Sequence, residues 1–329
     1  MRLAFIVADA RGQKPSWSTA WLAQAAMRHG HDVGFVSVDE LTLRPDNSVS
    51  ARVVRPGNPC ASREEMCAAL AAEDARVDDE SLTSFDVVFL RYHPRREGGG
   101  VHSPVIDFGW RLRLGDVQVY NDPEGTQRAG GRMYLGGLPA EIRPRTLVTR
   151  DSARLKRFLK ELDAPAVVKP FAEQHAGVEN VFYLTRGQSK NLNQILQVVR
   201  KTGYMVAQEY LPEVTQGEKR LRLLAGEPIR HAGQVAIYRR WPDGARREAT
   251  TYGAAEQRIV DLLRPRLEAD GLYLVGVDIV GAKVLEVNVY TPGGIRANHE
   301  LYGFDVSEAV VRDLERRVEV RRAYRKSVA

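Results

Sequence analysis

Three oxygen-bearing side chains near the C-terminal end of the chain have the spacing of a metal site. The segment 275–289 is typical of a β-hairpin that carries Asp278 on its first arm and Glu286 and Asn288 on its second. Side chains on a strand point alternately to its two faces, so the apolar residues of both arms share the opposite face. These apolar residues are Val275, Val277, Ile279, Leu285, Val287 and Val289. Their shared face predicts a register with residue 277 opposite 287 and residue 279 opposite 285, which places Asp278 opposite Glu286.

The chemistry of this face favours a divalent cation. Like charges that lie directly opposite each other on a sheet are destabilising, unless something positive lies between them. Carboxylate and amide oxygens suit hard cations, and Mg²⁺ in particular is commonly shared between one or two carboxylates and substrate phosphates. A hairpin at a sheet edge with a solvated polar face would show the same spacing. The spacing alone leaves both interpretations open.

Two further segments carry charges that could meet an anion. In 218–224, Glu218, Arg220 and Arg222 alternate with apolar residues, so they share one strand face. Such a row could balance an anionic ligand bound through a metal, or its members could simply pair with one another on a wet sheet, where ion pairs contribute little. Lys169 ends an apolar strand and either holds an anion or extends to solvent. The loop after it contains a single glycine, Gly177, and is therefore a weak signal for a phosphate-binding loop.

Length and composition limit the class of protein. A chain of 329 residues with 43% hydrophobic content can bury two or three domains. No apolar stretch approaches the length of a membrane span, and the opening segment is too short in its apolar run for a signal peptide, so we expect a cytoplasmic protein without membrane contact. Cys60 and Cys67 are expected to be reduced structural thiols.

The basic residues do not predict nucleic-acid binding. The net charge is +6, but Lys and Arg are spread along the chain, which suits small anions such as phosphates and carboxylates better. The basic segment 315–326 follows a helical stretch that begins near Val306, and we expect a solvated helix face or a frayed end there.

The elements that must position these residues form an α/β pattern. The first third alternates strand and helix as an open α/β layer, and a basic, glycine-rich loop at 95–100 follows the strand that ends at Arg91. That loop could touch a substrate or be a mobile surface tip. The predicted strands are 3–8, 32–37, 85–91, 117–121, 166–170, 181–184 and a strand from Tyr204 that runs into a hinge near Pro212, and the predicted helices are 16–29, a stretch from Pro123 through Met133, 151–162 and one from about 306.

These segments, in this order, resemble the ATP-grasp ligases, and among them the bacterial glutathione synthetases. The motifs that carry the resemblance are 167–170, 207–212, 217–220, 226–228, 275–281 and 286–289. The resemblance covers nearly the whole chain and is weakest around 45–80. It implies an α/β ATP-grasp fold with an N-terminal open parallel α/β substrate domain at 1–122, a central lid domain at 123–203 and a C-terminal, mainly antiparallel sheet domain at 204–329.

The resemblance also implies roles for individual residues. The implied cofactors are ATP and two Mg²⁺ ions, with Mn²⁺ as a substitute, and the metal ligands would be Asp278, Glu286 and Asn288. The nucleotide would contact Arg132, Lys169, Gln208, Glu209, Tyr210, Leu211, Glu218 and Asn288. Catalysis would use Lys169, Arg220 and Arg247, and substrates would contact Arg222, Arg240, Thr291, Gly293, Gly294 and Arg296.

The reaction implied is amide formation. ATP converts a carboxylate to an acyl phosphate, and an amine then attacks it to release ADP and phosphate, so catalysis consists of positioning and charge neutralisation. No Ser or Cys nucleophile is needed, and we expect no catalyst among His93, His102, His175, His231 and His299.

Several segments depart from the family pattern. The lid segment 169–177 is longer and poorer in glycine, Arg132 stands where the family has a lysine, and 247–253 replaces a glycine-rich segment that borders the reacting groups. The segment 291–296 keeps the family's shape. We therefore expect an ADP-forming ligase for a small amino acid or peptide, with γ-glutamylcysteine and glycine in doubt as substrates, and a homo-oligomer, either dimer or tetramer. The alternative is a non-catalytic ATP-grasp protein that binds nucleotide for regulation.

Overall fold

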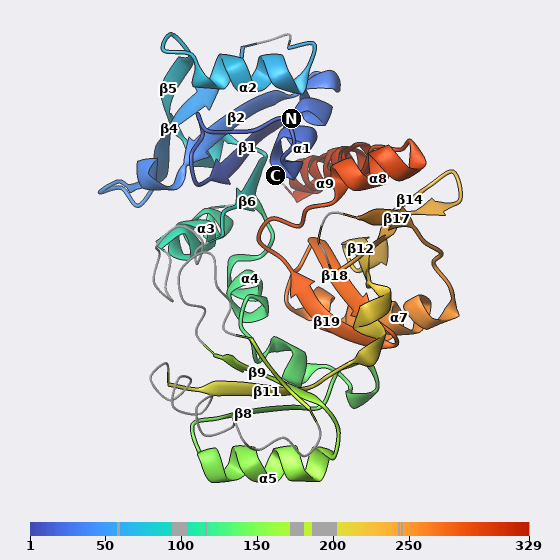
Figure 1. Ribbon diagram of the computed structural model, residues 1–329. Coiled ribbons are helices and arrows are strands. Elements are labelled where there is room, and N and C mark those ends of the chain that lie inside the picture. The colour runs from blue at the N-terminus through green and yellow to red at the C-terminus, as the bar shows by residue number, and fades with distance from the viewer. Residues whose placement is uncertain are drawn as a thin grey trace.

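The structure is a computed structural model that describes residues 1–328 except 58–59, 94–103, 116, 172–180, 186–202, 243 and 245. The described chain forms three main sheets, and the C-terminal sheet lies between the N-terminal sheet at the top and the lid sheet at the bottom (Figure 1). The resemblance to the ATP-grasp fold predicted this division into an N-terminal α/β layer, a lid and a C-terminal sheet.

The N-terminal sheet has the strand order β3-β4-β2-β1-β6-β7, with β5 paired to β4. Its strands are β1 (Arg2–Val7), β2 (Asp32–Ser37), β3 (Thr42–Leu43), β4 (Val49–Arg55), β5 (Arg76–Ser81), β6 (Val87–Arg91) and β7 (Gln118–Tyr120), and its helices are α1 (Ser18–Arg28), α2 (Arg63–Ala71) and α3 (Pro104–Leu114). The predicted parallel layer is confirmed for β2, β1, β6 and β7. It is wrong for 42–81, where β3, β4 and β5 pair antiparallel and extend one side of the sheet.

The lid sheet has the order β10-β9-β11-β8 and pairs antiparallel throughout. It contains β8 (Thr146–Thr149), β9 (Ala166–Pro170), β10 (Phe182–Leu184) and β11 (Met205–Glu209), with helix α5 (Ser152–Leu162). The side chain of Asp151 caps α5 by accepting from the backbone N–H of Ala153 at 2.7 Å. Because β11 pairs with β8 and β9, the lid sheet includes residues up to Glu209 and extends past the predicted boundary at 203/204. The domain limits 1–122, 123–203 and 204–329 remain a prediction.

The helix predicted from Pro123 through Met133 is shorter than expected. Helix α4 (Pro123–Ala129) ends at the glycine pair 130–131, and short 3-10 segments follow at Tyr134–Gly137 and Ala140–Ile142. A Cβ at Gly130 would come within 2.0 Å of the hydroxyl of Tyr290, so glycine is required where the chain leaves the helix.

The C-terminal sheet is antiparallel, with the order β17-β16-β12-β18-β19. It contains β12 (Glu218–Leu224), β13 (Glu227–Pro228), β16 (Ile237–Arg240), β17 (Arg247–Ala249), β18 (Leu274–Val280) and β19 (Lys283–Asn288), next to the hairpin of β14 (Arg230–His231) and β15 (Gln234–Val235), and the 3-10 segment Pro212–Gln216 precedes it. Helix α7 (Ala254–Ala269) packs Ile259, Val260 and Leu263 into one core cluster with Val277 of β18 and Val284 of β19.

The last two helices return to the N-terminal sheet. After α8 (Ile295–Tyr302), helix α9 (Val306–Val328) packs Val311 and Leu314 into the core cluster that contains the apolar side of α1 (Figure 1). The frayed end expected at 315–326 is wrong, because the helix continues to Val328 and Val318 is buried. The expected solvated face is present at Val320 and Tyr324, which are exposed.

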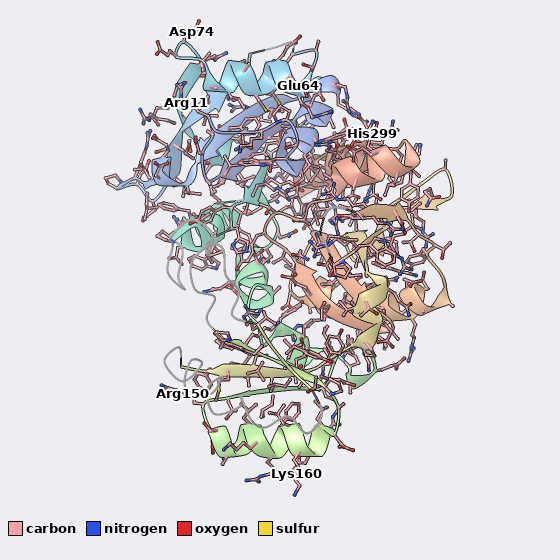
Figure 2. All side chains as sticks on the ribbon, viewed as in Figure 1. Arg11, Glu64, Asp74, Arg150, Lys160 and His299 are labelled. Atoms are coloured by element: carbon pink, nitrogen blue, oxygen red, sulfur yellow. The ribbon has the colours of Figure 1, made fainter. Side chains whose placement is uncertain are left out.

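Other expectations from composition can be compared with the structure. Cys60 and Cys67 are both free, as predicted, and burial raises the pKa of Cys67 to about 11. Charged side chains such as Arg11, Arg150 and Lys160 extend from different parts of the surface (Figure 2). Within the described residues, no helix has both the length and the apolar character needed to cross a membrane.

Candidate functional site

The hairpin of β18 and β19 brings the predicted metal ligands onto one face. Asp278 pairs with Glu286, and Gly276 pairs with Asn288, as the alternation predicts. The predicted pairing of residues 279 and 285 is wrong, because a β-bulge follows Asp278 and Ile279 pairs with Val284. The bulge leaves Leu285 as the additional residue, so fully buried Val284 takes the core position and Leu285 is only half-buried.

Asp278 has an incomplete set of hydrogen bonds. Its side chain is buried, and Oδ2 accepts from Arg220 Nη2 at 2.7 Å and from Asn288 Nδ2 at 3.2 Å. Oδ1 is also buried and has no hydrogen-bond partner among the residues that the structure describes. Burial raises the pKa of Asp278, while the nearby charge of Arg220 opposes this. A buried carboxylate oxygen without a partner is costly, so this atom fits a cation supplied by a ligand.

The other predicted ligands complete an oxygen-rich face. Glu286 is exposed directly opposite Asp278, and Asn288 is half-buried. Two carboxylates and one amide form a donor set that Mg²⁺ accepts. The residues present therefore fit the metal that the sequence implies.

Strand β12 places a row of charges beside Asp278. Arg220 pairs with Asp278 in the antiparallel register, and its Nε donates to Glu218 at 3.0 Å. Glu218 also forms an ion pair with Arg240, whose Nη2 lies 2.5 Å from Glu218 Oε1. Burial would lower the pKa of Arg220, but Asp278, Tyr238 and Glu218 together outweigh it and the pKa is raised. Ion pairs join Arg220 to Glu218 and Asp278, and they are largely buried rather than wet, because the side chains of Asp278 and Glu218 are only 2% and 12% exposed.

Arg222 connects this row to the loop before α8. It is fully buried, and its Nε donates to the carbonyl of Gly293. Gly294 has φ +89°, and a Cβ there would lie 2.6 Å from Arg222 Nη2 and 2.8 Å from the ring of Tyr238. The glycine is therefore required both by its backbone conformation and by the close approach of the guanidinium.

The remaining predicted substrate residues have other positions. Thr291 is half-buried in the same loop, whereas Arg296 is exposed on α8 and pairs with Glu300 at 2.6 Å. Arg247 is exposed on β17, opposite Arg240 on β16. The roles of Arg296 as a substrate residue and of Arg247 as a catalytic residue remain predictions.

The predicted nucleotide residues are divided between the lid and the C-terminal sheet: Lys169, Gln208 and Glu209 lie on lid strands, whereas Glu218 and Asn288 lie on β12 and β19. Lys169 is half-buried on β9, opposite Val206. Arg132 Nε donates to the carbonyl of Phe171, just after β9, at 3.1 Å. The loop 172–180, with His175 and Gly177, and the basic loop 95–100 with neighbouring His102 lie outside the described residues.

The predicted hinge begins as a strand and has engaged side chains. Gln208 is buried and donates to Thr146 Oγ1 at 3.2 Å, and Glu209 accepts from the backbone N–H of Arg145 at 3.1 Å. The backbone N–H of Tyr210 donates to Pro165 at 3.0 Å, and half-buried Leu211 follows. Some backbone groups here are thus already bonded within the lid.

Sequence reasoning missed Arg91. It ends β6, is buried, and donates to Thr19 Oγ1 at 3.2 Å and to Ser18 Oγ at 2.6 Å, at the first turn of α1. Its Nη1 is buried without a hydrogen-bond partner in the described part of the chain. Burial lowers the pKa of Arg91 to about 9, which leaves it cationic near neutral pH. The only signal in the sequence is that an arginine ends an apolar strand, which predicts the end of the strand but not a binding role.

The place of Arg91 in the sheet is informative. Strand β1 pairs with β2 on one side and with β6 on the other, and α1 connects β1 to β2. The strand order therefore reverses between β1 and β6. In open parallel sheets, ligands bind outside the carboxyl ends of the strands at such a point.

Comparison with known proteins gives a consistent result. Residues 1–125 match the model of the prokaryotic glutathione synthetase N-terminal domain, and residues 132–303 match that of the prokaryotic glutathione synthetase ATP-grasp domain. The chain is 31% identical to the glutathione synthetase of Synechococcus elongatus, over 96% of this chain and 98% of the relative. It is also 31% identical to that of Synechocystis sp., over 96% and 99%.

Solved structures support the fold. The ATP-grasp ligase PsnB, complexed with Mg, ADP and a precursor variant, aligns with a TM-score of 0.62 at 18% identity and covers 96% of this chain and 98% of its own. The D-cycloserine synthetase DcsG aligns with a TM-score of 0.60 at 17% identity and covers 95% and 99%. At these identities the similarity concerns the fold alone.

Proposed function

Since the chain belongs to the prokaryotic glutathione synthetase family and is an ADP-forming carbon–nitrogen ligase of ATP-grasp fold, we propose that it joins a small amino acid or peptide carboxylate to an amine. The substrates proposed differ from γ-glutamylcysteine and glycine, because the segments 169–177 and 247–253 depart from the family pattern. The observation that carries the ligase chemistry is the buried Oδ1 of Asp278, which lacks a protein partner within the described residues.

The proposed cofactors are ATP and Mg²⁺, held through Asp278, Glu286 and Asn288. Two ions are proposed, with Mn²⁺ as a substitute. When bound, the metal neutralises charge on the phosphates and orients them.

The protein contributes fixed positive charges. Arg220 is held in place by Glu218 and Asp278 and therefore needs little reorganisation when charge develops near it. Lys169 and Arg132 would bind phosphates from the lid, and the segment 208–211 would border the base. The ATP site is accordingly proposed between the lid and the C-terminal sheet.

The acyl donor is proposed to bind at Arg91. A cationic, buried guanidinium with one nitrogen that has no partner among the described residues suits a substrate carboxylate, and the N-terminus of α1 adds partial positive charge beside it. A dimer or tetramer is part of the proposal, and nothing in the site depends on it.

The test is ADP release with a panel of carboxylates, each with and without amines, followed by mass spectrometry of the product. γ-Glutamylcysteine with glycine serves as the reference pair. The proposal is supported if another carboxylate and amine give amine-dependent turnover that is faster than turnover of the reference pair. Preference for the reference pair overturns the altered specificity, and ATP binding without ADP release overturns ligation in favour of a regulatory role.

Arg91→Lys tests the donor site separately. We expect the KM for the carboxylate to rise about tenfold or more while the KM for ATP stays unchanged, because Lys keeps the charge but not the planar fork. Arg52→Lys is the matched control, since Arg52 is exposed and pairs with Glu40. An unchanged carboxylate KM in Arg91→Lys would contradict the assignment.

A further inference from the structure

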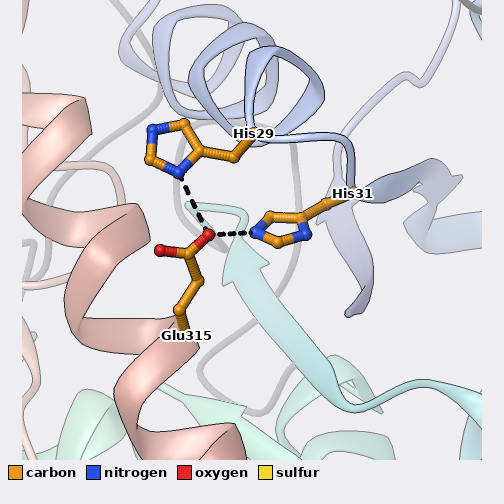
Figure 3. Close-up of side chains that lie close together, drawn as sticks. All are labelled: His29, His31 and Glu315. Atoms are coloured by element: carbon orange, nitrogen blue, oxygen red, sulfur yellow. Dashed lines mark hydrogen bonds and ion pairs between the residues drawn. The ribbon is translucent and has the colours of Figure 1, made fainter.

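A cluster of two histidines and one glutamate lies outside the ligase site. His29 follows the end of α1, His31 precedes β2, and Glu315 comes from the middle of α9 (Figure 3). The same Glu315 oxygen, Oε1, lies 3.0 Å from His29 Nδ1 and 2.8 Å from His31 Nε2. The three atoms all lie within 4.8 Å of one another.

The turn between the two histidines fixes their rings. Gly30 has φ +76°, and its N–H donates to Met27, while the N–H of His31 donates to Ala26. This helix-ending turn needs a glycine in the left-handed region. It holds His29 and His31 on the same side, with ring centroids 6.1 Å apart.

The hydrogen bonds of His29 leave room for a cation. Its other nitrogen, Nε2, lies 2.8 Å from Glu308 Oε2, so a carboxylate faces each ring nitrogen. A neutral imidazole has one N–H and can donate to only one of them. The second position must hold either an additional proton or a metal ion. A histidine that donates one nitrogen to a carboxylate and offers the other to a metal is a common arrangement.

We propose that His29 Nδ1, His31 Nε2 and Glu315 Oε1 bind a divalent transition-metal ion, of which Zn²⁺ is the representative. Imidazole nitrogen and carboxylate oxygen are Zn²⁺ ligands, and three protein ligands leave a fourth position for water. Ligands about 2.1 Å from a tetrahedral ion lie about 3.4 Å apart. The observed 2.8 and 3.0 Å separations therefore need to open by only about half an ångström.

Burial and charge support this site. The side chains of His29, His31 and Glu315 are 20%, 11% and 30% exposed, so an ion could enter from solvent. Burial lowers the pKa of His31, whereas the bonds to Glu308 and Glu315 outweigh burial and raise the pKa of His29, so an ion that enters the cluster would displace a proton. The role is structural, because the ion would join the turn between α1 and β2 to α9.

The experiment is titration of the chelator-treated full chain with Zn²⁺ by calorimetry, in saturating Mg²⁺ so that the ligase site is not available. We expect one Zn²⁺ per chain and a Zn²⁺-dependent rise in Tm. Co²⁺ should give the absorption of a tetrahedral site. Affinity should fall about 100-fold or more in His31→Gln and Glu315→Gln, and about 10- to 100-fold in Glu308→Gln, which keeps all three ligands.

Glu319→Gln is the matched control, one turn further along α9 and exposed. It should bind Zn²⁺ like the parent, and ligase turnover should stay unchanged in His31→Gln. The Tm of each variant in chelator shows that it is folded, and Glu308→Gln remains decisive if a ligand variant does not fold. The proposal is overturned if the chain binds no stoichiometric Zn²⁺, or if Glu315→Gln, Glu308→Gln and Glu319→Gln bind it with equal affinity. The cluster would then be held together by protons shared between the histidines and the carboxylates.

Discussion

Two buried aspartates lie eight residues apart and differ in how their oxygens are used. Asp270 follows α7, and its two oxygens accept from Arg128 at 3.0 Å, Tyr134 at 2.9 Å and Arg266 at 2.7 Å. Asp278, in β18, is more deeply buried, yet its Oδ1 has no hydrogen-bond partner in the described ranges of the chain.

The difference distinguishes a structural carboxylate from one that we propose binds a ligand. The contacts of Asp270 join α4, the 3-10 segment after it and α7, so they offset the cost of burying the charge. The free energy of folding gains nothing from an unpaired oxygen, and such an atom needs a functional explanation. Burial therefore does not distinguish the two residues, whereas the number of satisfied oxygens does.

Asp278→Asn should have the largest effect on activity. The substitution removes a charge from the proposed metal-binding face without changing the apolar face of the hairpin. We expect ADP release to fall by at least about 100-fold, with the Tm little changed. Glu286→Gln should behave similarly. Full turnover in either folded variant would contradict the metal assignment.

Asp270→Asn should have the opposite result. It weakens charge-assisted bonds from two arginines, and we expect a loss of about 2 kcal/mol in the free energy of unfolding. Activity per folded molecule should stay near that of the parent, as measured by denaturant unfolding and ADP release. A large loss of activity without a loss of stability would remove the distinction between the two aspartates.

The β-bulge beside Asp278 permits a finer test of the same strand pair. Val284 is fully buried and Leu285 is only half-buried. Val284→Ala should lower the free energy of unfolding by about 2 kcal/mol. Leu285→Ala should cost less than about 1 kcal/mol, although it removes a larger side chain. The reverse order, in paired denaturant titrations, would mean that the unbulged register is correct.

That bulge also marks the limit of what the sequence could predict. Alternation fixed Asp278 opposite Glu286 because the apolar residues at 277 and 287 demand it. It could not place the extra residue, since both Val284 and Leu285 are apolar and either could fill the core. The same alternation predicted that the charged side chains of β12 share one face, but it did not predict that this face is buried.

Features that depend on distant segments were less accessible. The proposed role of Arg91 depends on its contacts with Ser18 and Thr19, which the parallel pairing of β1 and β6 brings close to it. Strand β5 was missed because its apolar pattern is weak, as its exposed and half-buried residues show. The close approach of Tyr290 to Gly130, where α4 ends, is a contact that no local pattern reveals.

Glu256 provides a third buried acid, paired like Asp270, and should show the smallest effect. It accepts from Lys219 Nζ at 2.7 Å and from the backbone N–H of Gly253 at 2.8 Å, at the start of α7. Burial tends to raise the pKa of Glu256, but the bonds from Lys219 and Gly253 outweigh it and lower the pKa. Gln can still reach Gly253, so Glu256→Gln should cost only about 0.5–1 kcal/mol at neutral pH.

The pH dependence of this cost tests its origin. A lowered pKa in the folded state stabilises above the unfolded pKa, about 4.3, and that contribution is lost as pH falls through the folded value. The Tm difference between the parent and Glu256→Gln should therefore be constant from about pH 8 to 5 and shrink at lower pH. Glu268→Gln, exposed on the same helix, should show no such difference. A gap that persists at acidic pH would mean that the helix cap, rather than the charge of Glu256, carries the stabilisation.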